Sequence, residues 1–452
     1  MKILNSELKD FLKNNKILLI ILLLSFCASL FYSFHFKIKP LVDARAYDKI
    51  AFNIVSGQGY REDLDKDLAH DYAIARVGPL YQYFLAGAYK IFGHDLRPVW
   101  ILQAVVHALS AWLVYLTVLL IFFNSERKKT IGLWASAIFG FYPDLIEISA
   151  MLMSETLYLF LLCLMLYFFF WHFRQKSYWL VACLALASGL AVLARPTVLL
   201  FTPVIIFYFY RGKLWRQGIL FLIILAAVFT PWTVRNYAVY QEFMPFGAAG
   251  NFNFWIGNYH NGNGEQEPTD EQRQFAATEE VKNINGESLA RFKEFLRDYP
   301  AEFLKLTIFR ISKYFSVARP MGFWFYQTGL GQMLFVLSSA LASCFLFVLG
   351  LGGIIKSVFF KKETQREALA YLAVFALSVS LLVFVTVVET RYRFQIYPAL
   401  AIFAAYFLVA LGRIKTWAYN KILWAAIGLI FLNGLVDLLL NLERFKEKIG
   451  LF

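Results

Sequence analysis

Apolar segments of about 20 residues recur along the chain and alternate with shorter polar segments. A run of that length is long enough to cross the hydrocarbon core of a bilayer as a helix. The runs at 131–143 and 197–210 are short, so their boundaries are soft. The pattern predicts an all-α polytopic membrane protein with about 11 transmembrane helices. The predicted helices cover residues 17–36, 97–123, 131–143, 156–173, 178–194, 197–210, 218–232, 329–355, 368–388, 394–411 and 421–440.

The composition agrees with a membrane protein. Hydrophobic residues make up 59% of the chain and charged residues 17%, against about 45–50% and about 25% in soluble domains. These values exclude a disordered chain, and four cysteines in 452 residues are too few for a disulfide scaffold. The net charge of +13 lies in short loops and forms no basic stripe, so we expect no nucleic-acid partner.

The basic loops also predict an orientation. Lysine and arginine gather in every second short loop, as at Lys128 and Arg211, which indicates that these loops are cytoplasmic. The N-terminus is then cytoplasmic and the chain forms a multi-pass protein of the cell membrane. Two long polar segments, 37–95 and 233–328, fall on the extracytoplasmic side. We expect a single transmembrane unit over 1–452, without a separate soluble C-terminal domain.

The first outer segment contains two predicted interfacial helices. Residues 43–55 place Asp43, Tyr47 and Ile50 on one helical face. Asp43 follows the first apolar run by about seven residues, which puts it at the outer membrane boundary. Its alternative role is to cap that helix. A second amphipathic helix is predicted over 80–92, and the acidic stretch from Asp63 to Asp71 is expected to be solvated.

Ionisable residues gather where the predicted helices meet the outer face. Arginines are unexpected in outer turns, because positive charge normally favours the cytoplasmic side. A converging set of carboxylates and arginines indicates an anionic head group held at the outer leaflet, with a carboxylate available for chemistry. The histidines lack ligand spacing, so no metal site is favoured, although a divalent metal stays open. The residues of this set are Asp144, Glu147, Glu155, Arg195, Arg235, Glu389, Arg391 and Arg393.

The chain resembles the GT-C membrane glycosyltransferases of the glycosyltransferase family 39 type, which include the protein O-mannosyltransferases and the lipid A aminoarabinose transferases. The ordered series of motifs carries this resemblance, although no single motif is specific. One departure is Ala44, which stands where the family often has a second acid after the first. The motifs are Asp43-Ala-Arg-Ala-Tyr47, Gly57-Gln-Gly-Tyr60, Arg76-Val-Gly-Pro79, Ser154-Glu155-Thr156, Leu193-Ala-Arg195-Pro196, Arg235-Asn236, Asn253-Phe-Trp-Ile-Gly257-Asn258 and Glu389-Thr-Arg391-Tyr-Arg393.

The resemblance implies a GT-C-like bundle that transfers a monosaccharide, with inversion, from a polyprenyl-phosphate donor at the outer face. Departure of the phosphate needs cations, and the acceptor hydroxyl needs a base. Asp43 is the expected base, and Glu155 is expected to hold the acceptor or to raise the pKa of Asp43. No cofactor is expected, and the acceptor can be a lipid, a glycan or a protein. The expected substrate-binding residues are Tyr47, Arg76, Arg195, Arg235, Asn258, Glu389, Arg391 and Arg393.

Three alternatives stay open at this point. The first is a GT-C polymerase or ligase that moves an oligosaccharide from a polyprenyl diphosphate. The second is a transporter, which would place charges near the membrane midplane and show inverted repeats; neither feature is visible here. The third is a scaffold without catalytic activity.

Overall fold

A computed structural model describes residues 15–71, 73, 78–247, 249–318, 327, 329–359, 365–410 and 417–442. The predicted substrate-binding residue Arg76 lies outside these ranges. Helices account for nearly all of the secondary structure within them, and the one β-bridge in the described ranges joins Glu265 to Val388.

Eight helical segments within the described ranges are long and apolar enough to cross a membrane. A ninth span forms if two helices that meet at a bend of 57° are counted together: α6 (Lys128–Gly140) and α7 (Pro143–Ser149). The eight segments are α2 (Lys16–Phe36), α5 (Leu96–Ile121), α8 (Ser154–Arg174), α11 (Trp215–Tyr240), α16 (Gly329–Phe359), α17 (Arg366–Val385), the 3₁₀ turn η4 (Thr390–Ile396) continued by α18 (Tyr397–Ala410), and α19 (Trp417–Leu440).

Every predicted apolar run falls on one of these helices or on a shorter one. The run at 178–194 is α9 (Tyr178–Ala194), and the run at 197–210 is a 3₁₀ turn, η2 (Pro196–Phe201), followed by α10 (Thr202–Arg211). Both are shorter than a full span. The polytopic all-α fold is therefore confirmed, whereas the number of about 11 transmembrane helices is not.

Two prolines explain breaks in the helical pattern. A residue before proline is pushed out of the α conformation by the proline ring. Tyr142 accordingly has extended backbone angles before Pro143, where α6 ends and α7 begins. Arg195 is likewise extended before Pro196 and ends α9. This second break brings Arg195 out of the regular helix at the end of the bundle.

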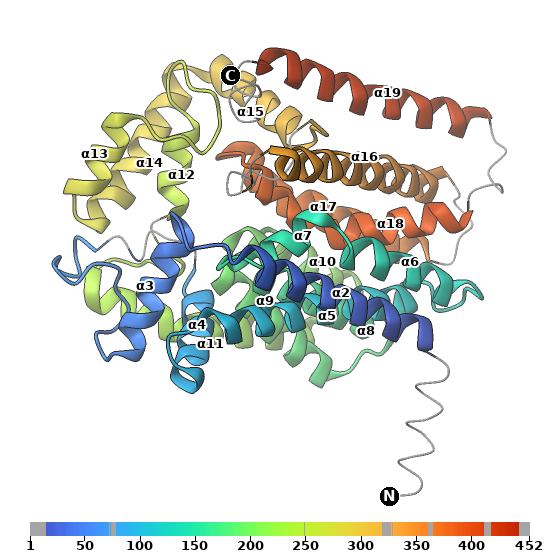
Figure 1. Cartoon of the computed structure of the whole chain (residues 1–452), viewed down its shortest axis with the longest axis horizontal. Coiled ribbons are helices and arrows are strands. Elements are labelled where there is room, and N and C mark those ends of the chain that lie inside the picture. Colours follow the sequence, from blue (N-terminus) through green and yellow to red (C-terminus); the bar gives the residue numbers. More distant parts are fainter. Residues whose placement is uncertain are drawn as a thin grey trace, which may run out of the picture.

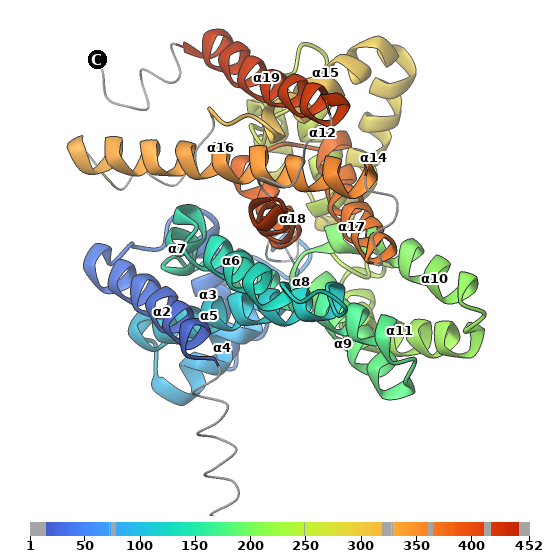
Figure 2. The same ribbon diagram turned by 90° about the vertical axis from the view of Figure 1, so that its right-hand side faces the viewer.

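The core of the bundle surrounds α18. This helix packs against α16 on one side and α6 on the other, and Figure 2 shows it below α16 and beside α17. Its residues from Tyr397 to Phe407 are all buried. The turn η4, which leads into α18, therefore continues into the most buried of the membrane-spanning segments in the described ranges.

The interfacial helices gather at one end of the bundle (Figure 1). The helices α3 (Asp43–Val55) and α4 (Leu80–Phe92) have the predicted bounds, and Gly93, in the left-handed region at φ 78°, ends α4. The remaining helices at this end come from the long segment between α11 and α16. They are α12 (Ala249–Gly257), α13 (Asp270–Thr278), α14 (Val281–Asp298) and α15 (Pro300–Tyr314).

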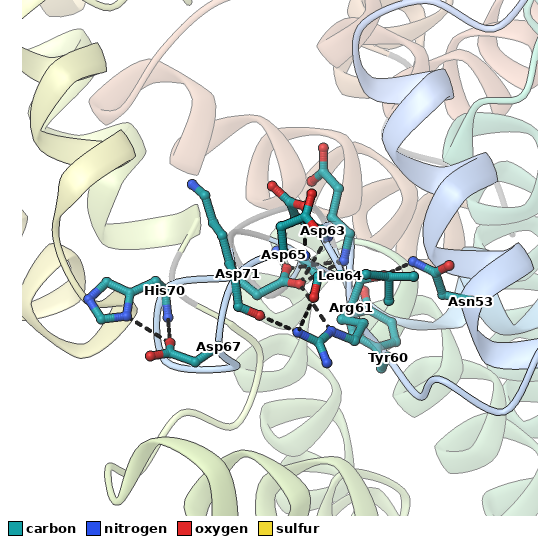
Figure 3. Close-up of polar contacts among 12 residues, drawn as sticks. Asn53, Tyr60, Arg61, Asp63, Leu64, Asp65, Asp67, His70 and Asp71 are labelled. Carbon is teal, nitrogen blue, oxygen red and sulfur yellow. Dashed lines mark hydrogen bonds and ion pairs between the residues drawn. The ribbon is translucent and has the colours of Figure 1, made fainter.

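The loop after α3 is folded around a buried aspartate (Figure 3). The Asp71 carboxylate accepts hydrogen bonds from the backbone N–H groups of Glu62, Asp63 and Ala73, at 2.8–3.1 Å. The side-chain amide of Asn53 donates to the carbonyl of Arg61 at 2.9 Å. The expectation of a solvated stretch is thus wrong for Asp71, because its oxygens satisfy backbone donors that the loop would otherwise leave unpaired.

Candidate active site

Four chain segments that are distant in sequence bring a charged cluster together at the end of the bundle where α3 and η4 begin. Asp43 begins α3, Glu155 lies in the first turn of α8, and Arg391 lies in η4. The Arg391 Nη2 donates to Asp43 Oδ2 at 2.8 Å, and its Nε donates to Glu389 Oε2 at 2.8 Å. Its Nη1 lies 3.6 Å from Glu155 Oε1. Arg391 is therefore the common partner of three carboxylates.

Arg195 completes the cluster from the end of α9. Its Nη2 donates to Glu155 Oε1 at 2.5 Å, and its Nε donates to the hydroxyl of Ser154 at 3.2 Å. Glu155 is thus held between the two arginines. We call the five residues Asp43, Glu155, Arg195, Glu389 and Arg391 the rim cluster.

The carboxylates of the rim cluster differ in exposure. The Glu155 side chain is 2% exposed, whereas those of Asp43 and Glu389 are 26% and 31% exposed. Glu155 is accordingly enclosed by protein, and Asp43 is open to an incoming molecule. The N-cap position of α3 is Val42, so the interpretation of Asp43 as the helix cap is wrong.

Tyr47 lies one turn after Asp43 on the same face of α3. Its ring is buried and packs edge-to-face on Tyr81, with 5.6 Å between the ring centroids. Burial and the neighbouring Asp43 charge raise the pKa of the Tyr47 phenol well above its usual value. The phenol therefore stays protonated at physiological pH and cannot serve as the base.

The turn that carries Arg391 is anchored from several directions. Val388 donates its N–H to the carbonyl of Gly264 at 3.1 Å, and the Tyr392 hydroxyl donates to Gln266 Oε1 at 3.0 Å. Arg393 is buried and donates to the Ser316 carbonyl and the Ser343 hydroxyl, at 2.7 and 3.1 Å. These contacts place Arg393, which was predicted to bind substrate, behind the rim cluster as an anchor of the turn.

Asn258 also takes part in a buried network rather than in the rim cluster. It is fully buried, and its side-chain amide donates to the carbonyls of Phe254 and Val385. Its Oδ1 accepts from Arg310 Nη2 at 3.0 Å. The structure thus shows Asn258 joining the end of α12 to the end of α17.

Arg310, on α15, is the centre of that network, and the sequence prediction missed it. Its guanidinium donates to the carbonyls of Gly257, Phe384 and Thr386 at 2.7–2.9 Å. Burial lowers its pKa to about 10, so it keeps its charge near neutral pH. The available signal was its spacing of four residues from Leu306 and from Tyr314, since all three are buried on one face of α15.

Arg235, near the end of α11, has different partners from the rim cluster. It donates to the carbonyl of Tyr60 at 3.0 Å, and its guanidinium lies 5.2–5.5 Å from the ring centroids of Tyr60, Trp232 and Tyr240. Such cation–π contacts stabilise a cation next to aromatic faces. Arg235 therefore fastens the loop after α3 to α11, and its predicted role in substrate binding stays a prediction.

A cavity of about 330 Å³ opens beside the rim cluster. Arg195 and Tyr392 line it on the cluster side, and the far walls come from α12, the end of α17 and the segment 243–247. Small-molecule sites usually have volumes of about 300–1,000 Å³ with a few placed polar groups. Among the described residues, no three His, Cys, Asp or Glu side chains are arranged to hold a metal ion.

One part of the sequence matches a known protein family. Residues 76–234 match the family described as dolichyl-phosphate-mannose-protein mannosyltransferase. This segment includes Glu155 and Arg195 but neither Asp43 nor Arg391. No curated protein sequence matches the chain significantly.

Solved structures share the fold. The oligosaccharyltransferase AglB from Archaeoglobus fulgidus, in complex with an inhibitory peptide and a dolichol-phosphate, aligns over 94% of the chain with a TM-score of 0.51 and 14% identity. The apo form aligns over 93% with a TM-score of 0.52 and 14% identity. ArnT from Cupriavidus metallidurans, bound to undecaprenyl phosphate, aligns over 87% of this chain and 78% of its own, with a TM-score of 0.42 and 13% identity.

The chain spans about half the length of the AglB structures, covering 55% and 54% of them. At this identity the likeness concerns the fold, and it agrees with the motif series and with the matched mannosyltransferase segment. The chain is a multi-pass membrane protein with the GT-C fold of the membrane glycosyltransferases.

Proposed function

We propose that this protein transfers a monosaccharide from a polyprenyl-phosphate donor to a hydroxyl acceptor at the extracytoplasmic face of the membrane. The observation that carries the proposal is the rim cluster: a partly exposed carboxylate, Asp43, is paired with Arg391, and Glu155 joins Arg391 to a second guanidinium, that of Arg195. In the reaction the acceptor oxygen bonds to the anomeric carbon, and the bond from that carbon to the phosphate oxygen breaks. The products are an inverted glycoside and a polyprenyl phosphate.

The two arginines suit the departing phosphate. Arg195 and Arg391 present fixed, charged donors, and such donors stabilise negative charge most strongly where water is largely excluded. A bound phosphate would compete with the carboxylates for these donors. The lipid chain of the donor would lie along the membrane-facing helices near the outer end of the bundle.

Asp43 suits the role of general base. Its ion pair with Arg391 fixes the direction of the carboxylate. Its exposure leaves one side open to an acceptor hydroxyl, whose proton it would take as the glycosidic bond forms. Glu155 is enclosed between the two arginines, so we assign to it the positioning of Arg195 and Arg391 rather than contact with the acceptor.

The basic loops support the side of the membrane that we propose for the site. The loop with Arg127 and Lys128 contacts the end of α18 through a hydrogen bond from Arg127 to the Val409 carbonyl, whereas the rim cluster lies near the start of η4. The two features therefore lie at opposite ends of the bundle (Figure 1). If the basic end is cytoplasmic, the rim cluster is extracytoplasmic. Labelling of single cysteines with an impermeant reagent in intact cells should modify position 260 and spare position 128.

The experiment for the proposed function is a turnover assay in liposomes. Purified protein would receive a polyprenyl phosphate carrying a labelled monosaccharide, together with hydroxyl acceptors from the lipid, glycan and peptide classes. The proposal predicts release of unlabelled polyprenyl phosphate and an inverted product. Turnover of a polyprenyl-diphosphate oligosaccharide in place of the monosaccharide donor would contradict it.

A further inference from the structure

The cavity beside the rim cluster has walls suited to a sugar. Its polar groups are amides, hydroxyls and the guanidinium of Arg195, and its apolar groups include the aromatic rings of Phe246 and Phe254. Amides can both donate to and accept from hydroxyl groups. The polar residues that line it are Arg195, Thr197, Asn251, Asn253, Asn285, Thr386, Tyr392 and Gln395.

Some of these polar groups are already used within the protein. The Gln395 Oε1 accepts from Thr197 and Tyr158, and its amide nitrogen donates to the Val379 carbonyl. The Tyr392 hydroxyl donates to Gln266. Thr197, Tyr392 and Gln395 therefore form a fixed wall.

The asparagines of α12 keep bonding capacity toward the cavity. Asn253 uses its Oδ1 to accept from Gln266 at 3.2 Å, and within the described ranges its amide nitrogen has no partner. Asn251 uses its amide nitrogen to donate to Asn285, and its Oδ1 likewise has no partner in those ranges. Within the described ranges, the same wall thus offers one free hydrogen-bond donor, on Asn253, and one free acceptor, on Asn251. The hydroxyl groups of a sugar can use both, because a hydroxyl donates and accepts hydrogen bonds.

The charge of the cavity selects against ionised sugars. Arg195 is its one charged residue within the described part of the chain. Glu155 pairs with Arg195, and Glu242 accepts from Asn285 behind the wall. A protonated amino sugar would meet a guanidinium without a carboxylate in the wall, and a uronic acid would find Arg195 already shared by Glu155 and the donor phosphate.

We infer that this cavity is the sugar subsite of the donor and that it takes an uncharged, hydroxyl-rich monosaccharide. The inference rests on the proposed function and adds the class of sugar. It follows from the position of Arg195, which lies both in the cavity wall and in the rim cluster, so a phosphate on the arginines leaves its sugar next to Asn251 and Asn253.

Three polyprenyl-phosphate donors that differ at one position of the sugar test this inference. The first carries a neutral hexose, the second the same hexose with an amino group in place of one hydroxyl, and the third the corresponding uronic acid. The wild-type protein should bind and turn over the neutral donor at least about tenfold better than either charged donor, a difference of about 1.4 kcal/mol.

The variant Asn253→Asp adds a carboxylate to the cavity with almost no change of shape, and Asp can still accept the bond from Gln266. It should lower the preference for the neutral over the amino donor at least about tenfold. Asn283→Asp, at an exposed position on α14 outside the cavity, is the matched control and should leave the preference unchanged.

The outcomes distinguish a failure of the sugar subsite from a failure of the proposed transferase function. Turnover of the three donors at equal rates, or an unchanged preference in Asn253→Asp, overturns the sugar subsite and leaves the transferase proposal standing. A failure of all three donors to bind or react overturns both. A preference that follows the acceptor rather than the donor would assign the cavity to the acceptor and contradict the inference.

Discussion

Arg391 and Arg310 are both buried arginines, but they have chemically different partners. Arg391 faces three carboxylates, and two of these, Asp43 and Glu389, are partly exposed. Arg310 faces neutral backbone carbonyls together with the side chains of Asn258 and Thr307. The buried carbonyls around Arg310 would lose a hydrogen-bond donor if the arginine turned to a ligand. The partly exposed carboxylates around Arg391 can instead be replaced by an anionic ligand that competes for the guanidinium.

The two buried arginines therefore differ in role: one holds helices together and the other can bind a ligand. Around Arg310 the chain closes tightly: a Cβ on Gly257 would lie 1.8 Å from the Thr386 carbonyl oxygen, so only glycine fits there. Around Arg391, two of the partner carboxylates are partly exposed. We therefore assign Arg310 to holding α12 against α17, and Arg391 to binding the donor.

The largest expected effect is that of Arg391→Ala. It removes the common partner of three carboxylates and one of two donors for the phosphate, so turnover should fall about 10²–10³-fold. Arg391→Lys should recover only part of the loss, because a point charge lacks the planar fork of the guanidinium. The liposome assay measures both variants, with Arg297→Ala as a surface control. Turnover within a few-fold of wild type in Arg391→Ala would remove the distinction between the two arginines.

Arg310→Met should act mainly on stability. The change leaves several buried carbonyls without a donor, at about 1–3 kcal/mol for each unsatisfied group. We expect a clear fall in the thermal unfolding temperature, with turnover at low temperature reduced less than in Arg391→Ala. The exposed variant Arg291→Ala is the control. A normal unfolding temperature combined with lost turnover would place Arg310 in the chemistry instead.

Arg235→Ala sharpens the comparison at a third arginine. The guanidinium of Arg235 is held by the Tyr60 carbonyl and three aromatic rings. Its loss should loosen the loop after α3, so the affinity for the polyprenyl-phosphate donor should fall less than about tenfold. Donor titration followed by turnover measures this. A loss as large as that of Arg391→Ala would show that Arg235 binds the phosphate.

The smallest expected effect is that of Tyr47→Phe. Burial, together with the Asp43 charge, raises the pKa of this phenol well above its usual value, so its proton stays on throughout the range in which the enzyme can be assayed. The alkaline limb of the pH–rate profile should therefore keep its position, and turnover should change less than about tenfold. Disappearance of that limb in Tyr47→Phe would identify Tyr47 as the titrating group.

Much of the fold could be predicted because it depends on local properties of the chain. Apolar length located the membrane helices, and the 3.6-residue period located α3 with its buried Tyr47 face. The number of full spans could not be predicted, because apolar runs do not show which helices are long enough to cross. The runs on either side of Pro196 form helices shorter than a full span, and the run that ends at Pro143 leads into a bend of 57°.

The sequence predicted which residues form the rim cluster but not which of them pair with each other. Charges at the outer helix ends marked Asp43, Glu155, Arg195 and Arg391, which the fold brings together. The bond from Arg391 to Asp43 joins residues 348 positions apart, and no local signal specifies it. For the same reason the sequence did not separate Arg391 from Arg393, which is two positions away but faces the interior of the bundle.

The central claim is that the carboxylate held by Arg391 is the base of a glycosyl transfer, and Asp43→Asn tests it most directly. Asparagine keeps the shape and an oxygen for Arg391 but cannot take up the acceptor proton. Asp48→Asn, on the same helix, is the matched control, because Asp48 accepts from Tyr89 and lies outside the rim cluster. With a labelled polyprenyl-phosphate hexose in liposomes, we predict normal donor binding and turnover reduced at least about 10²-fold for Asp43→Asn, with near-normal turnover for the control. Turnover of Asp43→Asn within a few-fold of wild type would contradict the assignment of Asp43 as the base.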